Sequence, residues 1–526
     1  MRIALIYPFF LYTRVHGENV EPLPIGLYTL GACLLEQGHV VELFNWHTAE
    51  LAQAGLPALE AFRPDMVGFS LFHANRWGGI ELARVVREML PQAFIVFGGV
   101  GATFLDEHLL RLVPELDVIV RGEGERTLVE LAEAVERGEL SALSVIPGLS
   151  RREQGRVVRN ADRPLLARLD DLPHPARHFT FQHVSLSRGC VGKCSFCGSP
   201  RFWGSGIRFH SAEYFLDELE LLYKRGVRFF YVSDDTFTVR RELTLAICRG
   251  IRERGLEMNW AAISRVDCVD AELLCAMRQA GCIQISYGVE SGSASILSAL
   301  NKPLRTEQVE RAFALTTRHG ILARAYVIYG SPGETDATIA ETLDLLERIK
   351  PLVVLFHVLA VFPGTTLYES CRARLGWDDD IWLDRDEDIL YYETDAALPE
   401  ERVLESGRRL RQAWLERLPA YAGAIELEDR SELAGLHADF LSRLALTFHQ
   451  GDYAHNEHIP RKRETAAQLY RRSLAYAPNS RAYLGLALLL ENERNASAAT
   501  ELLHEGLRLF PQERQFQEAL TRLRGR

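Results

Sequence analysis

The chain has no long hydrophobic run, and it carries fewer basic than acidic residues. No stretch approaches the ~20 apolar residues of a membrane-spanning helix. The apolar start, residues 1–10, is too short for a signal peptide and has no small-residue cleavage site, so we expect a first β-strand there. The 60 Lys and Arg against 71 Asp and Glu leave a net charge of −11, which argues against a nucleic-acid partner.

Cysteine is scarce and unevenly distributed. Nine cysteines in 526 residues do not form the pattern of a secreted disulfide framework, so we expect a cytoplasmic protein in a reducing environment. The length suits about three domains. A composition that is 47% hydrophobic and 25% charged is ordinary for a globular chain.

Three of the cysteines lie in one short run, SRGCVGKCSFCGSP, with the spacing C-x3-C-x2-C. Cys190, Cys194 and Cys197 can hold three irons of a 4Fe–4S cube and leave the fourth iron open to a chelating small molecule. Zinc is the main alternative, and it would need a fourth ligand, for which His183 and His210 are the nearest candidates. Plain structural thiols are the other alternative.

Residues 1–140 alternate strands with helices, which predicts a doubly wound parallel sheet. Ligands of such sheets bind at the carboxyl ends of the strands. The loops expected there are Ser70–Asn75, Gly98-Gly99 with Gly101, and Gly122-Glu123-Gly124. Glycines let the backbone approach a large ligand closely, although each one alone is equally typical of a tight turn.

These loops together resemble the cobalamin-binding domain that precedes many radical S-adenosylmethionine (SAM) enzymes. The resemblance rests on Ser70, on Gly98-Gly99, and on the segment VRGEGERTL at 120–128, which contains Gly122 and Glu123. It implies that Ser70 and the two glycines line the pocket for the cobalamin nucleotide tail, with Gly122 and Glu123 as further contacts. A degenerate domain that no longer binds cobalamin is the alternative.

One feature of other cobalamin proteins is missing. The D-x-H-x-x-G motif, which places a histidine under the cobalt, is absent, and the corresponding region reads EPLPIGLY at 21–28. By resemblance, cobalamin binds here without a histidine on the lower face of the metal.

After a predicted linker at 141–182, residues 183–400 again alternate strands and helices, which predicts a (β/α)6 partial barrel. This stretch resembles the radical SAM superfamily over about 220 residues, through the cysteine loop, YGVESGS, GSPGET and FPGTTLYE. The resemblance implies that the three cysteines hold the cluster and that SAM chelates the open iron. One electron, from a donor such as flavodoxin or ferredoxin, then cleaves SAM to a 5′-deoxyadenosyl radical.

The same resemblance implies the SAM contacts: Phe196 beside the adenine, Ser233 and Asp234 at the amino group, Arg265 as a polar contact, Glu290 at the ribose, and Gly330 and Pro332 at the adenine wall. Two alternatives remain open. Asp234, Asp235 and Arg265 can form a structural ion pair, and Glu290 can cap the next helix. For contact with the substrate we name Asp235 and Tyr287 as catalytic candidates, with Tyr326 at a similar strand end.

Residues 401–526 read as amphipathic helices. Between 464 and 511 two segments align with Pro478 and Pro511 33 residues apart, a spacing that resembles tetratricopeptide repeats. Such helix pairs bind protein partners or pack on their own chain, and we favour packing or self-association.

The sequence therefore predicts a cobalamin-dependent radical SAM enzyme that acts on a small organic substrate, with methylation of an unactivated carbon as the leading reaction. The anaerobic magnesium-protoporphyrin monomethyl ester cyclase family is also similar, so oxidative cyclisation or rearrangement is the alternative. A non-enzymatic cobalamin sensor is a third, weaker reading.

Overall fold

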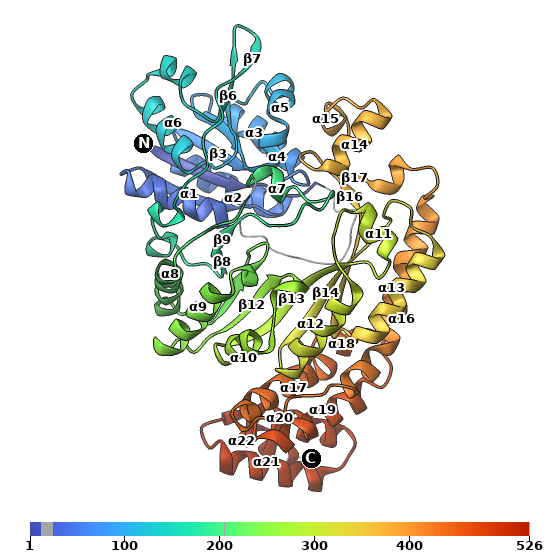
Figure 1. The fold of residues 1–526 in the computed structure, drawn as a ribbon. Helices are drawn as coiled ribbons and strands as arrows, with labels where there is room; N and C mark the ends of the chain where they lie inside the picture. The colour runs from blue at the N-terminus through green and yellow to red at the C-terminus, as the bar shows by residue number, and fades with distance from the viewer. Residues whose placement is uncertain (12–24, 205, 525–526) are drawn as a thin grey trace.

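The computed structural model describes residues 1–11, 25–204 and 206–524, so part of the EPLPIGLY region lies outside the described residues. An N-terminal sheet, a second parallel sheet and a helical tail follow one another along the chain (Figure 1). The first sheet has the strand order β2-β1-β3-β4-β5-β6-β7. Its strands are β1 (Arg2–Tyr7), β2 (Val40–Asn45), β3 (Met66–Ser70), β4 (Phe94–Gly98), β5 (Val118–Val120), β6 (Leu149–Glu153) and β7 (Arg156–Arg159).

The first five of these strands are parallel, which confirms the predicted doubly wound sheet. Leucines, valines and phenylalanines pack the helices against both faces of the sheet. The helices are α1 (Ile25–Glu36), α2 (Ala49–Phe62), α3 (Arg76–Met89), α4 (Gly99–Phe104), α5 (Asp106–Leu112) and α6 (Glu125–Glu136). The helix α2 contains Pro57 and was not foreseen from the sequence.

The structure corrects the predicted linker at 141–182. Strands β6 and β7 lie inside that segment, yet they extend the N-terminal sheet by antiparallel pairing with β5 and with each other. The tight turn between them places Gln154 and Gly155 at positive φ, as two-residue hairpins require. The strands are short and polar, so they lack the apolar alternation that marks a strand in sequence. The other domain boundaries stay predictions.

The second sheet has six parallel strands in the order β15-β14-β13-β12-β11-β8, which confirms the predicted (β/α)6 partial barrel. Its strands are β8 (His183–Val184), β11 (Phe229–Val232), β12 (Asn259–Ser264), β13 (Cys282–Glu290), β14 (Leu322–Tyr329) and β15 (Val353–Val358). The covering helices are α8 (Ala212–Lys224), α9 (Arg241–Glu253), α10 (Ala271–Gln279), α12 (Thr306–Arg318) and α13 (Asp336–Ile349). Shorter elements near the mouth are β9 (Ser187–Arg188), α7 (Ser199–Phe202), β10 (Arg208–Phe209), α11 (Ala294–Ala299), β16 (Ala360–Val361), α14 (Thr366–Leu375), α15 (Ile381–Asp384) and β17 (Ile389–Leu390).

The helical tail packs on the amino-terminal end of the barrel strands. Trp414 donates to the Pro351 carbonyl at 3.0 Å and Tyr453 to the Leu352 carbonyl at 2.6 Å, both just before β15. The first helix of the tail begins beside the carboxyl end of β14, where Val403 lies close to Gly330, and the rest of the tail, red in Figure 1, lies at the end of the barrel opposite the cysteine loop. Its helices are α16 (Glu400–Gly423), α17 (Ala434–His449), α18 (Asp452–His455), α19 (Lys462–Tyr476), α20 (Ser480–Asn492), α21 (Ala496–Leu509) and α22 (Arg514–Arg524).

Helices α19 to α22 pack as successive neighbours, but this arrangement does not identify tetratricopeptide repeats, which stay a prediction. Across the residues that the structure describes, we find no helix with the length and hydropathy needed to cross a membrane.

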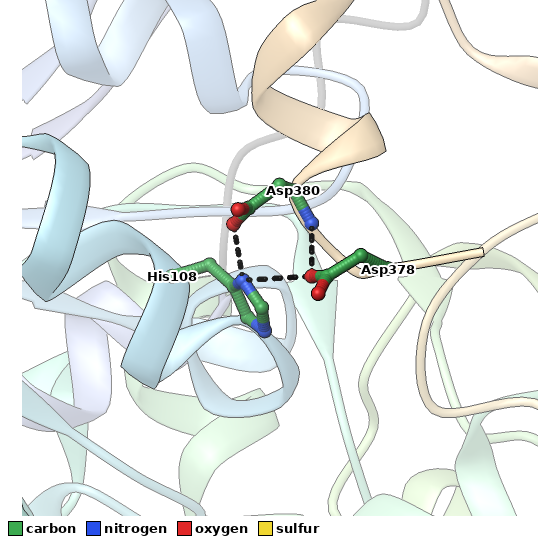
Figure 2. Close-up of side chains that lie close together, drawn as sticks. All are labelled: His108, Asp378 and Asp380. Atoms are coloured by element: carbon green, nitrogen blue, oxygen red, sulfur yellow. Dashed lines mark hydrogen bonds and ion pairs between the residues drawn. The ribbon is translucent and has the colours of Figure 1, made fainter.

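An ion-pair cluster joins the N-terminal sheet to the segment before α15. His108 of α5 lies 2.6 Å from Asp380 and 3.5 Å from Asp379, and Figure 2 shows Nδ1 of its ring facing the carboxylates of both Asp378 and Asp380. Arg111 also pairs with Asp380. Because the carboxylates already have cationic partners, we interpret the cluster as a clasp between the two parts of the chain rather than as a metal site.

Replacing His108 with glutamine should lower the thermal midpoint at pH 6.5 but have little effect at pH 10. Hydrogen bonds with Asp379 and Asp380 raise the pKa of His108 to about 9, although burial opposes this. A histidine whose folded-state pKa is raised stabilises the fold fully below its ordinary pKa, and this contribution is lost as the pH rises through about 9. Thermal denaturation at both pH values, with the exposed His458→Gln as control, checks this. An equal loss at both pH values would contradict an ionic clasp.

Candidate active site

The three cysteines lie directly after β9, where the chain turns at the mouth of the barrel. All three are free and half-buried. The loop is anchored at Ser195, whose amide donates to the Leu300 carbonyl at 2.9 Å and whose carbonyl accepts from Leu367 at 2.7 Å. Burial raises the pKa of Cys194 against the opposing charge of Lys302, with Glu290 and Cys190 adding to the rise, and burial raises the pKa of Cys197 to about 11. Metal binding must therefore displace protons from this loop.

The spread of the sulfur atoms favours a cluster over zinc. A tetrahedral zinc ion with Zn–S bonds of ~2.3 Å needs sulfurs about 3.8 Å apart. The three sulfurs here are not all within 4.8 Å of one another. Neither candidate fourth ligand groups with the three sulfurs among the described residues; His183 lies 3.0 Å from Ser233, and His210 lies 3.1 Å from Asp170. The donor set and its spacing fit three irons of a cube, each with one thiolate.

Arg265 lies at the end of β12, beside the cysteine loop. A Cβ on Gly192 would be 3.4 Å from the Cys190 sulfur, 3.6 Å from the Cys194 sulfur and 3.5 Å from Nη1 of Arg265. The remaining guanidinium nitrogens contact Asp267 at 3.0 and 2.8 Å. Arg265 therefore does not pair with Asp234 or Asp235, so the alternative ion pair is wrong.

Glu290 ends β13 at a φ of 61° and is buried. Its carboxylate pairs with Lys302, a residue that sequence reasoning missed, and both charges act on Cys194. A Cβ on Gly288 would lie 2.5 Å from each charged group, so the Glu290–Lys302 pair lies directly against this glycine. Glu290 does not cap the following helix, whose N-cap is Ser293, and the alternative reading of Glu290 as a cap is wrong.

Asp234 does not face the site in the way that the sequence suggested. It is 1% exposed, and its carboxylate accepts from the Leu186 amide at 2.9 Å and from the Ser187 hydroxyl. Burial raises its pKa to about 7 despite these hydrogen bonds. Asp234 therefore positions the strand that leads into the cysteine loop. The neighbours Ser233 and Asp235 line the cavity described below, and Asp235 accepts a hydrogen bond from Ser199.

Tyr287 is also corrected. Strand side chains alternate between faces, and along β13 Ser286 and Gly288, which precede the register shift, share one face, so Tyr287 lies on the other. Its side chain is fully buried, and its hydroxyl lies 2.8 Å from the Thr316 hydroxyl on α12. A residue between the sheet and its covering helix cannot touch a substrate inside the barrel.

Tyr287→Phe should therefore leave turnover nearly unchanged and lower the free energy of unfolding by about 1 kcal/mol, the net value of one hydrogen bond. Urea denaturation and turnover of the same preparation check this. A loss of turnover beyond tenfold without a matching loss of stability would restore a catalytic role.

A cavity of about 750 Å³ lies between the two sheets. All five predicted cobalamin residues line it: Ser70, Gly98, Gly99, Gly122 and Glu123. From the barrel side it is lined by Cys197, Ser199, Ser233 and Asp235. A Cβ on Gly122 would meet no atom within 4 Å, so this turn leaves open space on the cavity wall. The cavity thus joins the loops that suit a large cofactor to the cysteine loop.

Glu123 has a second role that only the structure reveals. Its carboxylate accepts from the Leu166 amide at 2.7 Å, from Arg188 at 2.6 Å and from Arg208 at 2.8 Å. Burial alone would raise the pKa of Glu123, but the Leu166 amide and Arg188 hold it below its ordinary value. Since Arg188 directly precedes the cysteine loop, Glu123 ties the N-terminal sheet to the cluster loop.

The remaining predicted SAM residues do not line this cavity. Phe196 is partly buried against the main hydrophobic core. The Gly330 amide donates to Glu334 at 2.8 Å, and a Cβ on Gly330 would lie 2.9 Å from Val403 of α16. Pro332 is half-buried after it. Their contacts with SAM stay predictions.

Both halves of this site match known families. Residues 184–346 match the radical SAM superfamily, and residues 19–132 match the B12 binding domain. The chain is 31% identical over 388 residues to an uncharacterized methyltransferase of Pyrococcus horikoshii, across 71% of this chain and 83% of the relative. It is 29% identical to the anaerobic magnesium-protoporphyrin IX monomethyl ester cyclase of Cereibacter sphaeroides, across 60% of this chain and 54% of that protein.

Solved structures show the same fold. The methyltransferase TsrM of Kitasatospora setae, solved with cobalamin and a 4Fe–4S cluster, superposes with a TM-score of 0.63 at 19% identity, over 90% of this chain and 99% of that one. The cobalamin-dependent enzyme OxsB, solved with aqua-cobalamin and SAM, gives a TM-score of 0.57 at 20% identity, over 100% of this chain and 83% of that one.

The two matched segments meet at the shared cavity, so the fold and site define a radical SAM enzyme with a cobalamin domain in the same chain. The chain belongs to the B12-binding radical SAM enzymes, and it is related to methyltransferases and to magnesium-protoporphyrin cyclases. The cofactors of this class are a 4Fe–4S cluster, SAM and cobalamin. The non-enzymatic sensor reading is therefore wrong.

Proposed function

We propose that this enzyme methylates an unactivated carbon of a small organic substrate. The observation that carries the proposal is the single cavity lined both by Cys197 and by Gly98-Gly99. When bound, the cluster and SAM supply a carbon-centred radical, and cobalamin supplies a methyl group. A substrate carbon in a shared cavity can meet both without leaving the enzyme, which suits group transfer between two cofactors.

The residues of the chain hold these parts together and keep water out. Glu123 and Glu125 form ion pairs with Arg188, which lies just before the cysteine loop. Most of the cavity wall is apolar, with Phe72, Phe202 and Trp203 among its side chains. An apolar wall excludes water from the cavity and so protects a radical from side reactions with solvent.

Aromatic side chains line the open interior of the barrel. By strand alternation Tyr231, Tyr326 and His357 face inward, and Tyr231 is 42% exposed. The rings of Tyr326 and His357 lie 6.0 Å apart. Such faces suit a substrate with a flat or apolar part. Tyr326 and Asp235 are our candidates for contact with the substrate.

For SAM we propose Phe196 at the adenine, Ser233 at the amino group, Glu290 at the ribose and Arg265 as a polar contact. This arrangement is supported by the positions of Arg265 and Glu290 beside the cysteine loop. Gly330 and Pro332 remain candidates for the adenine wall. A flavodoxin- or ferredoxin-like donor would supply the electron. The helical tail packs on the barrel, and we propose that packing or self-association, rather than peptide binding, is its role.

Oxidative cyclisation is the second candidate. It is supported by the 29% identity to the anaerobic magnesium-protoporphyrin IX monomethyl ester cyclase of Cereibacter sphaeroides. The methyltransferase relative aligns over more of this chain and at higher identity, which favours methyl transfer.

Cells fed methyl-deuterated methionine test the proposal, with the wild-type gene against Cys194→Ala. A metabolite that carries an intact trideuteromethyl group only with the wild-type enzyme is the expected result. The matched control is Cys275→Ala, a buried cysteine far from the loop in sequence, which should behave as the wild type. An unlabelled product that has lost hydrogens would establish cyclisation instead, and the absence of any cluster-dependent product would overturn both.

A further inference from the structure

His73 is a buried histidine on the wall of the cofactor cavity, and none of the roles described above is assigned to it. It lies in the loop between β3 and α3, three residues after Ser70, and it is 8% exposed. Its ring stacks on Phe362, with centroids 5.3 Å apart and an interplanar angle of 24°. It lines the same cavity as Ser70 and Gly99.

Neither ring nitrogen of His73 makes a well-formed hydrogen bond with the protein, although the Pro363 carbonyl lies close enough to act on the ring. A buried polar group without a partner is costly, so each such group calls for an explanation. In the part of the chain that the structure describes, every other buried histidine has a partner for at least one ring nitrogen: His39, His210, His319 and His437. Among the described residues that line the cavity, the unpartnered buried side-chain nitrogens all belong to His73.

The loop holds this imidazole in a fixed position. Asn75 is fully buried and accepts from the Phe72 amide at 2.7 Å. Arg76 donates to the His73 carbonyl at 2.7 Å and to the Trp382 carbonyl at 2.7 Å. A preorganised side chain of this kind is typical of a ligand position.

The imidazole is also in the right protonation state to bind a metal. Burial, and then the charge of Arg76, lower the pKa of His73 to about 3, against the influence of the Pro363 carbonyl. The ring is therefore neutral at physiological pH and offers a lone pair.

We propose that His73 is an axial ligand to the cobalt of bound cobalamin, on the lower face of the corrin ring. The resemblance places Ser70 at the nucleotide tail, which hangs from that face, and His73 follows Ser70 by three residues in the same loop. The sequence suggested that no histidine lies below the cobalt, because the D-x-H-x-x-G motif is absent. His73 reaches the same face from a different loop. This holds whichever reaction the enzyme performs.

Electron paramagnetic resonance of the cob(II)alamin form tests the proposal without a reaction. The full-length enzyme is prepared with ¹⁵N-histidine and loaded with its cluster and with unlabelled cobalamin. An axial nitrogen splits the cobalt lines into triplets when it is ¹⁴N and into doublets when it is ¹⁵N. We expect doublets in the labelled enzyme and triplets in the unlabelled one.

Two outcomes with wild-type enzyme would overturn the proposal. Triplets that persist after labelling would assign the ligand to the cofactor's own base, and lines without nitrogen splitting would leave His73 as an aromatic packing residue. Labelled His73→Ala should lose the doublets, with His73→Gln in its place if that variant does not fold. Labelled His178→Gln, a change at a partly exposed histidine paired with Glu36, should keep them. Doublets that survive the loss of His73 would assign the ligand to another histidine and overturn the proposal.

Discussion

Replacing Cys194 with alanine should remove the iron–sulfur cluster and abolish turnover. The wild-type chain should carry about four irons after anaerobic reconstitution, as a 4Fe–4S cube requires. The variant should carry almost none, because two thiolates cannot hold the cube at a half-exposed loop. Cys194 also lies beside Lys302 and Glu290, so its loss leaves that charge pair facing an empty position.

Iron and sulfide analysis, with the absorbance of the cluster, measures this effect directly. The matched control Cys275→Ala should retain the cluster, since Cys275 is buried on α10. A Cys194→Ala chain that still binds about four irons per molecule would contradict the assignment of the loop.

Replacing Gly99 with alanine should weaken cobalamin binding by more than tenfold. Gly99 has a φ of +89°, and its added Cβ would lie 2.7 Å from the Leu71 carbonyl oxygen. The Leu71 amide is bonded to the Gly98 carbonyl at 2.8 Å, so the loop cannot retreat without losing this contact. Movement of Leu71 would displace the neighbouring Phe72 and His73 on the cavity wall.

The matched control is Gly38→Ala. Gly38 has a similar φ of +84°, but a Cβ there would meet nothing within 4 Å. This variant should lose only the ~1–2 kcal/mol of a left-handed backbone position and keep its affinity for cobalamin. Equilibrium titration with hydroxocobalamin and thermal denaturation separate the two effects. Equal affinities in both variants would show that the close approach at Gly99 does not shape the site.

Much of the architecture could be predicted because its signals are local. Apolar strands alternate with amphipathic helices along both sheets, and the parallel order follows from the helical crossovers. The hairpin of β6 and β7 was missed because polar strands carry no such alternation.

The buried position of Tyr287, which the sequence analysis names as a catalytic candidate, could be predicted from the sequence. Ile285, Tyr287 and Val289 alternate with Ser286, Gly288 and Glu290, so the apolar set belongs against the helices. The hydrogen-bond partners of Asp234 and Glu123 could not be predicted from the sequence. Ser187 lies 47 residues from Asp234 and Arg188 lies 65 residues from Glu123, and no local pattern marks such distant pairs.

By itself, the sequence determined the cluster loop, the two α/β units and the class of cofactor. Cys190, Cys194 and Cys197 lie within eight residues, and a stretch this short keeps its thiols together in almost any compact fold. The tertiary structure decided which strand faces meet the cavity, that Glu123 binds the cluster loop, and that His73 lies unpartnered on the cavity wall. These facts depend on the packing of segments far apart in the chain. That packing is the sum of many weak contacts, and no single residue pattern records it.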